Sequence, residues 1–221
     1  MDACLLNLSL LRPVAMPRAL LQPPTPRLGS EYIQIDMTTS ASLLAPAIMT
    51  AEEVFESVTN GGASDFSAVV KILNQNKPWC LIDGLAVNCY VEPVYTIDAD
   101  IVLVADRLQQ ISKQLEEAGF DIERFEHSVN AKRGSSRLRI QFTTDVRYQE
   151  FLGETEEREV LGQRVPVATL ENVILGKIWA WKDQTRRASK RKKDELDLLR
   201  IAETYPNLRE KIPAEIVEQL K

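Results

Sequence analysis

The stretch from residue 79 to residue 105 limits the possible folds of this chain more than any other. Residues 79–82 are a short apolar run suited to a buried strand, and Gly84 and a small expected helix over 85–91 come next. A second strand is expected over 96–104, where apolar residues are nearly continuous, as is typical of a strand covered on both faces. The stretch therefore predicts a sheet packed between helices.

Helix and strand patterns alternate over residues 49–168 and give way to helices over 169–221. Thr50 is expected to cap a first helix and Asp106 a later one, while Gly162 is expected to turn a hairpin. The other expected elements are a helix over 64–76, strands over 120–125 and 138–142 separated by a polar loop at 130–136, and three C-terminal helices of which Thr169 caps the first. We predict an α/β (α+β) core over 49–168 and a C-terminal helical segment over 169–221.

The first fifty residues differ in composition from the rest of the chain. They hold six of the eleven prolines and no lysine, which predicts a poorly structured leader over 1–48. Its apolar run 5–11 is too short for a membrane-spanning helix and ends at Arg12, so no membrane partner is expected. A targeting segment and a later translation start, at Met37 or Met49, both stay open.

The composition narrows the chemistry that the chain can perform. The net charge is −5 and His127 is the only histidine among 221 residues, which leaves little room for Ser-His or Cys-His catalysis or for a multi-histidine metal site. Three widely spaced cysteines give neither a disulfide framework nor a zinc site and fit a cytoplasmic protein. If the chain is an enzyme, carboxylates and lysine must carry the chemistry.

Asp98 and Asp100 are candidate metal ligands. They lie two residues apart on an expected strand, so their side chains share one face. Two carboxylates on one face repel each other unless a cation lies between them, and Mg²⁺ prefers carboxylate and phosphate oxygens. The alternative is that one aspartate ends the strand and the other caps a helix or forms a salt bridge.

The order of these motifs resembles the nucleotidyltransferase superfamily, in which a glycine-opened helix precedes a magnesium-binding Asp-x-Asp. Here a strand, Gly84, a small helix and then Asp98-Ala99-Asp100 on the next strand follow one another. The C-terminal part resembles the minimal and abortive-infection toxin branch, through Lys177 and Ala180 on one helix and Lys193, Asp194 and Asp197 on the next. The similarity covers about residues 65–204. It implies a small mixed sheet flanked by helices and a site that the C-terminal helices complete.

The resemblance implies a magnesium-dependent transfer of a nucleoside monophosphate from a nucleoside triphosphate to an RNA or protein hydroxyl. Asp98 and Asp100 would bind Mg²⁺, and Gly84 would let the backbone approach a phosphate. Lys177 would contact the phosphates, and Asp194 would position or deprotonate the acceptor hydroxyl. Alternatively, Lys177 only packs its stem on an amphipathic helix while its charge reaches water.

Two departures from the superfamily pattern support a second class of function. Asp83 stands where a glycine is usual and puts a negative charge where a triphosphate would pass. Gln141 lies on the strand where the polymerase-like branch carries a third carboxylate. The alternative is a catalytically impaired, nucleotidyltransferase-like binding or regulatory module, as one half of a toxin–antitoxin pair whose partner is an antitoxin protein.

A basic run from Arg186 to Lys193 holds six cations in eight residues of an acidic chain. Such a run attracts a phosphate backbone, which makes RNA a candidate partner. The alternative is a solvated helix start whose cations pair with Asp194, Glu195 and Asp197.

Overall fold

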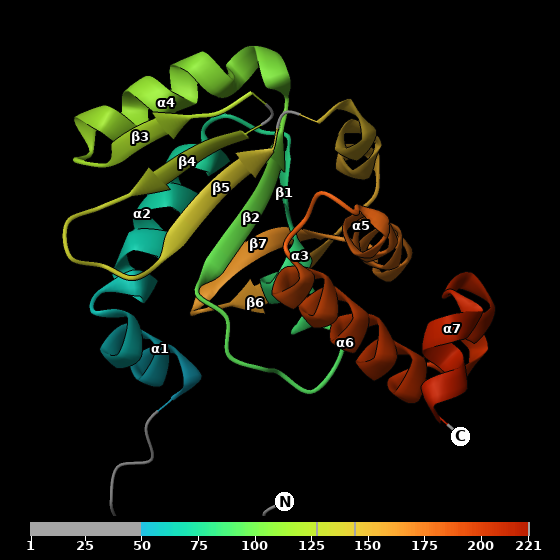
Figure 1. Ribbon diagram of the computed structural model, residues 1–221. Helices are drawn as coiled ribbons and strands as arrows, with labels where there is room; N and C mark the ends of the chain where they lie inside the picture. Colours follow the sequence, from blue (N-terminus) through green and yellow to red (C-terminus); the bar gives the residue numbers. More distant parts are fainter. Residues whose placement is uncertain (1–49, 127, 144, 221) are drawn as a thin grey trace, which may run out of the picture. The chain divides into compact units, whose positions relative to one another are not determined.

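A mixed β-sheet forms the centre of the fold (Figure 1). The computed structural model describes residues 50–126, 128–143 and 145–220. Within them lie the strands β1 (Trp79–Ile82), β2 (Asp98–Leu103), β3 (Asp121–Arg124), β4 (Ser128–Lys132), β5 (Arg139–Thr143), β6 (Thr155–Val160) and β7 (Gln163–Ala168). Their order in the sheet is β3-β4-β5-β2-β1-β7-β6. The pairs β1–β7 and β2–β5 are parallel and the other neighbours are antiparallel, so the expected α/β fold with a mixed sheet is confirmed.

Helices pack on both sides of this sheet (Figure 1). The α-helices are α1 (Ala51–Thr59), α2 (Gly62–Asn74), α3 (Asp83–Val87), α4 (Leu108–Glu117), α5 (Leu170–Lys182), α6 (Ala188–Thr204) and α7 (Ala214–Val217), with short 3₁₀ helices η1 (Ala105–Arg107), η2 (Val146–Gly153), η3 (Pro206–Lys211) and η4 (Glu218–Leu220). α2 packs against α4 on one side, while α5 and α6 pack against each other and against α3 on the other. No helix among the described residues is long and apolar enough to cross a membrane.

The two faces of the sheet differ in polarity because side chains alternate along each strand. On β2, Ala99, Ile101 and Leu103 are fully buried on one face, whereas Asp98 and Asp100 lie on the other. β5 follows the same rule, with buried Ile140 and Phe142 alternating with exposed Arg139 and Gln141. The parallel register places Asp98 beside Arg139 and Asp100 beside Gln141. One face of β2 and β5 therefore builds the core, and the opposite face carries charged groups.

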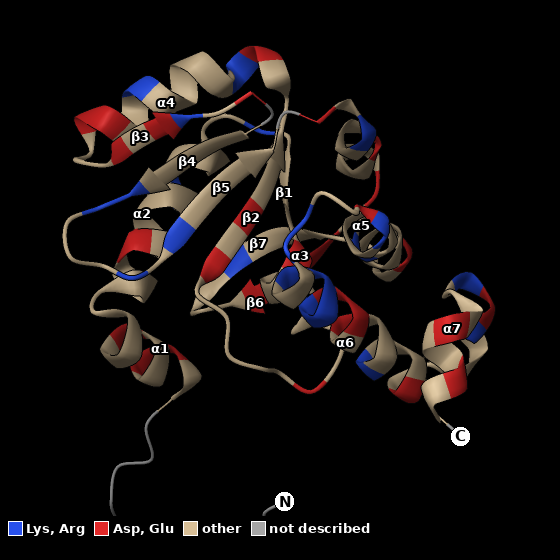
Figure 2. Ribbon diagram, viewed as in Figure 1, with Lys and Arg blue, Asp and Glu red and all other residues tan. Residues whose placement is uncertain are grey.

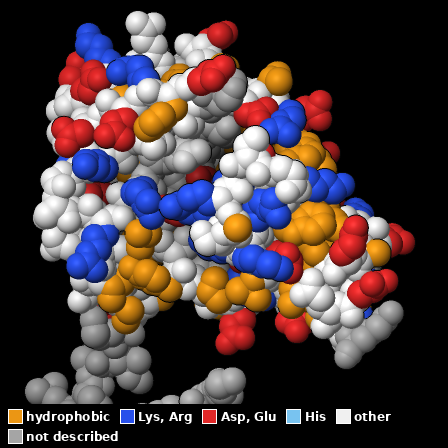
Figure 3. All heavy atoms as spheres, viewed as in Figure 1, with side chains coloured by type: hydrophobic (Ala, Val, Ile, Leu, Met, Phe, Trp, Pro, Cys, Tyr) orange, Lys and Arg blue, Asp and Glu red, His pale blue; other side chains and the backbone are white. Residues whose placement is uncertain are grey.

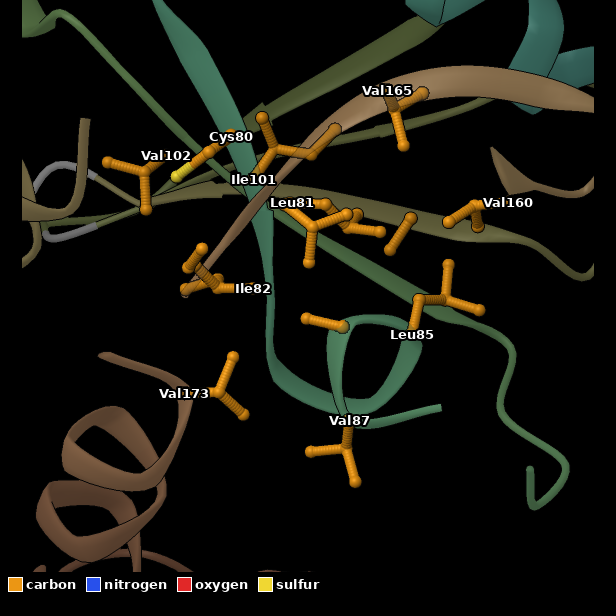
Figure 4. Close-up of a cluster of buried hydrophobic side chains, with 14 of the residues drawn as sticks. Cys80, Leu81, Ile82, Leu85, Val87, Ile101, Val102, Val160, Val165 and Val173 are labelled. Atoms are coloured by element: carbon orange, nitrogen blue, oxygen red, sulfur yellow. The ribbon is translucent and has the colours of Figure 1, made fainter. Parts of the chain in front are cut away.

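Apolar contacts fix the short helix α3 that separates β1 from the loop before β2. All four residues of β1 are buried, and Figure 4 shows Leu85 of α3 pointing toward the side chains of the strands, while Val87 lies on the other side of this helix. Leu85 and Val87 are 6% and 0% exposed, and burying one such side chain stabilises a fold by about 1.5–3 kcal/mol. This packing holds the chain around Asp83 in one place relative to β2.

Most expected elements are confirmed, and two expectations are wrong. The strand over Trp79–Ile82, the capped start of α1 at Thr50 and the hairpin turn at Gly162 lie where the sequence predicts them. Asp106, however, lies inside η1 and does not cap α4, whose N-cap is Arg107. The expected polar loop at 130–136 overlaps β4, which lies between β3 and β5. Its sequence is mostly polar, but the alternating residues Val129 and Ala131 are buried and stabilise it as a strand. The expected leader lies outside the described residues.

Candidate functional site

A polar cavity of about 310 Å³ lies over the charged face of β2 and β5, beside the start of α6. Its charged lining residues are the acids Asp83, Asp98, Asp100 and Asp194 and the bases Arg139, Arg186, Lys190 and Lys193. Figure 2 shows the acidic positions on β2 next to a basic position on β5 and the basic start of α6. Three of the predicted site residues, Asp98, Asp100 and Asp194, therefore share one cavity.

Asp98 is held between two cations. Its Oδ1 atom lies 3.0 Å from Nε of Arg139 on the neighbouring strand, and its Oδ2 atom accepts a hydrogen bond of 2.9 Å from Nζ of Lys190 on α6. The strand register explains the first contact. The second contact joins residues 92 positions apart in the sequence, so it depends on α6 packing over the sheet.

Asp100 lies beside Asp98 on the same face and pairs with Gln141 on β5. Burial, followed by the negative charges of Asp83 and Asp98, raises the pKa of Asp100 to about 8. A divalent cation next to two such carboxylates favours their ionised forms. Gln141 also lines the cavity and offers an amide oxygen, so the donor set fits a hard ion such as Mg²⁺. Asp98 and Asp100 are the residues that would hold it.

Lys177 is buried in a cluster of three aspartates below the cavity. Its side chain is 2% exposed, and its Nζ atom forms an ion pair with Asp83 and lies 3.0 Å from Asp194 and 2.7 Å from Asp197. Burial alone would lower the pKa of Lys177, but the three carboxylates outweigh burial and raise it. Carboxylate oxygens of these aspartates lie within 4.8 Å of one another, so the ammonium occupies the kind of position that a metal ion takes in an acidic cluster.

Asp83 adopts a left-handed backbone conformation, with a φ angle of 58°. This conformation costs little for glycine and more for other residues, which explains why glycine suits the position. The Asp83 carboxylate pairs with Lys177, and its Oδ2 atom lies 3.9 Å from Arg186. Although burial opposes the effect, Lys177 lowers the pKa of Asp83. The negative charge that the sequence places here is therefore offset by neighbouring cations.

Gly84 lies beside the cavity and is enclosed by side chains from two other segments. A Cβ atom at this position would lie 3.2 Å from Oγ1 of Thr96 and 3.5 Å from Nζ of Lys193. Lys193 in turn lies within 3.3 Å of the Thr96 hydroxyl. A side chain at position 84 would therefore crowd the Thr96 hydroxyl, whereas its contact with Lys193, one of the cations that line the cavity, would be an ordinary one.

Five of the six cations of the basic run contact other side chains of the chain. Arg186 pairs with Asp194 and Lys192 with Glu195, as the solvated-helix alternative predicted. Arg186, Lys190 and Lys193 also line the cavity. Figure 3 shows Lys and Arg side chains gathered in a row across the middle of this face. The start of α6 therefore supplies cations to the cavity.

The cavity residues that were not predicted from the sequence include Arg139, Asn130 and Tyr148. Arg139 alternates with apolar neighbours on β5, and this period of two is a signal that could have placed it on the same face as Gln141. Asn130 lies on β4, the strand that was not predicted from the sequence. Its Oδ1 atom is buried and has no hydrogen-bond partner among the described residues. Tyr148 comes from a 3₁₀ helix and has no sequence signal of this kind.

Comparisons with known proteins find no matching family model and no matching curated protein. Among solved structures, the chain is similar to the antibiotic-resistance factor ANT(2'')-Ia, with a TM-score of 0.49 and 15% identity over 73% of this chain and 90% of that one. It is similar to the lincosamide antibiotic adenylyltransferase LnuA, with a TM-score of 0.41 and 14% identity over 59% and 94% of the two chains. An antigenic nucleotidyltransferase-like protein from Paracoccidioides brasiliensis gives a TM-score of 0.44 and 16% identity over 67% and 75%.

An adenylyltransferase and a nucleotidyltransferase-like protein are thus among the solved structures that this chain resembles.

Proposed function

We propose that this chain is a magnesium-dependent nucleotidyltransferase that moves a nucleoside monophosphate from a nucleoside triphosphate to an acceptor hydroxyl. The observation that carries the proposal is the cavity over β2, where Asp98 and Asp100 share one face and cations surround them. Carboxylates that hold Mg²⁺ next to cations that hold phosphates are the two parts that phosphoryl-group chemistry requires. The acceptor is an RNA or protein hydroxyl, as the sequence resemblance implies.

In the proposed reaction, the acceptor oxygen forms a bond to the α-phosphorus, the bond to the β-phosphate oxygen breaks, and pyrophosphate leaves. Asp98 and Asp100 would hold Mg²⁺, which would offset the charge that develops on the transferring phosphate. Asp194 lines the same cavity and is the proposed group that positions the acceptor hydroxyl and takes its proton. Arg186, 2.9 Å from Asp194, provides positive charge beside the leaving pyrophosphate.

We assign Lys177 a positioning role in this scheme. Its ammonium is surrounded by carboxylates, so the cations that face the cavity are better placed to contact phosphates. Through its ion pairs, Lys177 holds Asp83 and Asp194 at the cavity wall. The proposed phosphate contacts therefore come from Arg186, Lys190 and Lys193.

A second candidate function is a non-catalytic binding module with an antitoxin protein as partner. One observation favours it: both carboxylate oxygens of Asp98 already contact cations of the chain, which competes with metal binding. In this function the cavity would bind a nucleotide or an RNA phosphate and transfer nothing.

The two candidates are separated by incubating the full chain with each α-labelled nucleoside triphosphate, Mg²⁺ and total RNA. The enzyme is supported if label enters RNA or protein with the wild type, and if Asp98→Ala and Asp100→Ala each abolish it. Asp106→Ala is the matched control, because Asp106 is exposed and lies outside the cavity. Triphosphate binding without any labelled product favours the binding module. No triphosphate binding at all rejects the enzyme and leaves RNA phosphate as the ligand of the binding module.

A further inference from the structure

One side of the cavity is lined by neutral hydrogen-bonding groups. They are Asn130 on β4 and Gln141 and Thr143 on β5, and β5 lies between β4 and β2 (Figure 1). Asn130 lies directly opposite Gln141, and Gln141 lies directly opposite Asp100, so these three side chains share one face of the sheet. We call Asn130 and Gln141 the amide pair.

We propose that the amide pair is the subsite for the nucleobase of the donor triphosphate, and that it selects a base with an exocyclic amino group beside a ring nitrogen, as in adenine and cytosine. The inference rests on the proposed function for the binding of a nucleoside triphosphate in this cavity. It deepens that function by naming the class of donor, which the proposed function leaves unnamed.

The position of the amide pair suits the nucleoside part of the donor. Neighbouring strands lie about 4.8 Å apart, so β4 is roughly 10 Å from β2 across the sheet. The proposed phosphate contacts lie around the start of α6, so the part of the ligand that extends from the metal site over β5 toward β4 is the nucleoside. The amide pair is also uncharged, and a neutral wall suits a base better than a phosphate.

Asn130 has an oxygen that lacks a partner. Its Oδ1 atom is buried and accepts no hydrogen bond within the part of the chain that the structure describes, which costs stability. Rotation of the amide exchanges the positions of its oxygen and its NH₂ group. Glu123 lies directly opposite Asn130 on β3, so its carboxylate can accept from the NH₂ group once the oxygen faces the cavity. A ligand that donates to this oxygen then satisfies both ends of the amide.

Gln141 can supply the complementary group. A glutamine amide has an oxygen that accepts and an NH₂ group that donates, so it can offer its oxygen to the metal site beside Asp100 and its NH₂ group to the base beside Asn130. The amide pair then presents an acceptor next to a donor, which matches an exocyclic amino group next to a ring nitrogen. Guanine and uracil carry a carbonyl oxygen next to a ring N–H, so at this edge they meet like groups.

The test measures binding of nucleoside triphosphates to the full chain by calorimetry, with Mg²⁺ and without an acceptor. ATP is compared with ITP and CTP with UTP, because the second nucleotide of each pair carries a carbonyl oxygen in place of the amino group. We expect the wild type to bind the amino partner of at least one pair roughly tenfold or more tightly. Asn130→Leu, which keeps a similar volume without a hydrogen-bonding group, is expected to bind both members of that pair equally.

Ser128→Ala is the matched control, because Ser128 is on the same face of β4, two residues before Asn130, and lies outside the cavity lining. It is expected to match the wild type with all four triphosphates. A preference within the ATP pair alone identifies an adenine donor, and one within the CTP pair alone identifies a cytosine donor. Should Asn130→Leu fail to fold, Asn130→Ala gives the same comparison.

The inference is overturned if none of the triphosphates binds, or if neither pair shows a preference for its amino partner. It is also overturned if Ser128→Ala loses the preference as Asn130→Leu does. A loss of affinity in Asn130→Leu by the same factor for all four triphosphates would overturn it as well, because that result shows a contact with the ribose that they share.

Failure of this inference differs from failure of the proposed function. A base preference that depends on Asn130, with no labelled product from any triphosphate, supports the base subsite and rejects the transferase. Labelled product that depends on Asp98, formed equally well from amino and carbonyl bases, supports the transferase and rejects the base subsite.

Discussion

Replacing Lys177 by methionine is expected to lower the free energy of unfolding by about 3 kcal/mol. Methionine keeps much of the buried volume but removes the ammonium that three carboxylates contact. Removing one partner of a buried ion pair costs roughly 3–5 kcal/mol. The lower end applies here because Asp194 keeps Arg186 at 2.9 Å and Asp197 keeps Arg200 at 2.8 Å.

Lowering the pH is expected to shrink this difference. Against the opposing effect of burial, Lys177 lowers the pKa of Asp83, so in the wild type this carboxylate contributes stability that is present above about pH 4 and is lost as the pH falls further. Without the ammonium, the opposing effect of burial raises the pKa of the Asp83 carboxyl group. A raised carboxyl pKa costs stability at high pH, and this cost is recovered as the pH falls through that value.

The assay is guanidinium unfolding followed by circular dichroism at about pH 5 and about pH 8, the two sides of this expected recovery. Lys182→Met is the control, because Lys182 is an exposed lysine at the end of the same helix. A loss below about 1 kcal/mol at the higher pH, the range of a surface pair, would refute the reasoning. So would a loss that is equal at both pH values.

Calcium gives a second readout of the same variant. The three aspartates have carboxylate oxygens within 4.8 Å of one another, so removing the ammonium leaves a set of hard ligands that suits Ca²⁺. Ca²⁺ should raise the unfolding midpoint of Lys177→Met more than that of the wild type. Equal shifts in both proteins would show that the carboxylates do not converge once the lysine is gone.

Three further predictions concern the rest of the fold. Phe142→Ala, at a side chain that is 0% exposed, should cost about 3–5 kcal/mol in the same unfolding assay; a cost below half of this would contradict its place in the core. Burial raises the pKa of Cys80 to about 12. In a Cys4→Ser background at about pH 8, the Cys80 thiol should therefore react with iodoacetamide roughly a thousandfold more slowly than an unfolded thiol. Mass spectrometry of the labelled peptides measures the two rates, and equal rates would refute the prediction. Gly162→Ala should cost about 1–2 kcal/mol, because φ is 72° there, whereas a neutral result at Gly162 would show that the hairpin turn adapts.

Local patterns made the strands and most helices of this fold predictable. All residues of Trp79–Ile82 are buried, so their continuous apolar run predicted a strand correctly. Gly162 predicted the hairpin turn between β6 and β7 because the backbone there has a positive φ angle, which favours glycine. β4 was not predicted because only Val129 and Ala131 of its five residues are buried. Two alternating apolar residues are too few to indicate a strand within a mostly polar stretch. The cap at Asp106 was wrong because an extra 3₁₀ turn moves the N-cap by one residue, to Arg107.

The candidate site was predictable only where its residues are close in sequence. Asp98 and Asp100 share a face through the strand period alone, and both line one cavity with Asp194. The contact of Lys190 with Asp98 depends on the packing of α6 over the sheet, which no local pattern encodes. The same holds for the enclosure of Lys177, whose three carboxylate partners come from two helices.

The distance along the chain between Asp98 and Lys190 has a consequence for how the protein is made. The strand that carries Asp98 leaves the ribosome 92 residues before Lys190 does, and synthesis proceeds at about 5–20 residues per second. For several seconds the nascent chain therefore presents an acidic strand face without the cations that later cover it. The cavity comes into being only when α6 reaches the sheet, so a chain interrupted before that helix would carry Asp98 and Asp100 and lack the site.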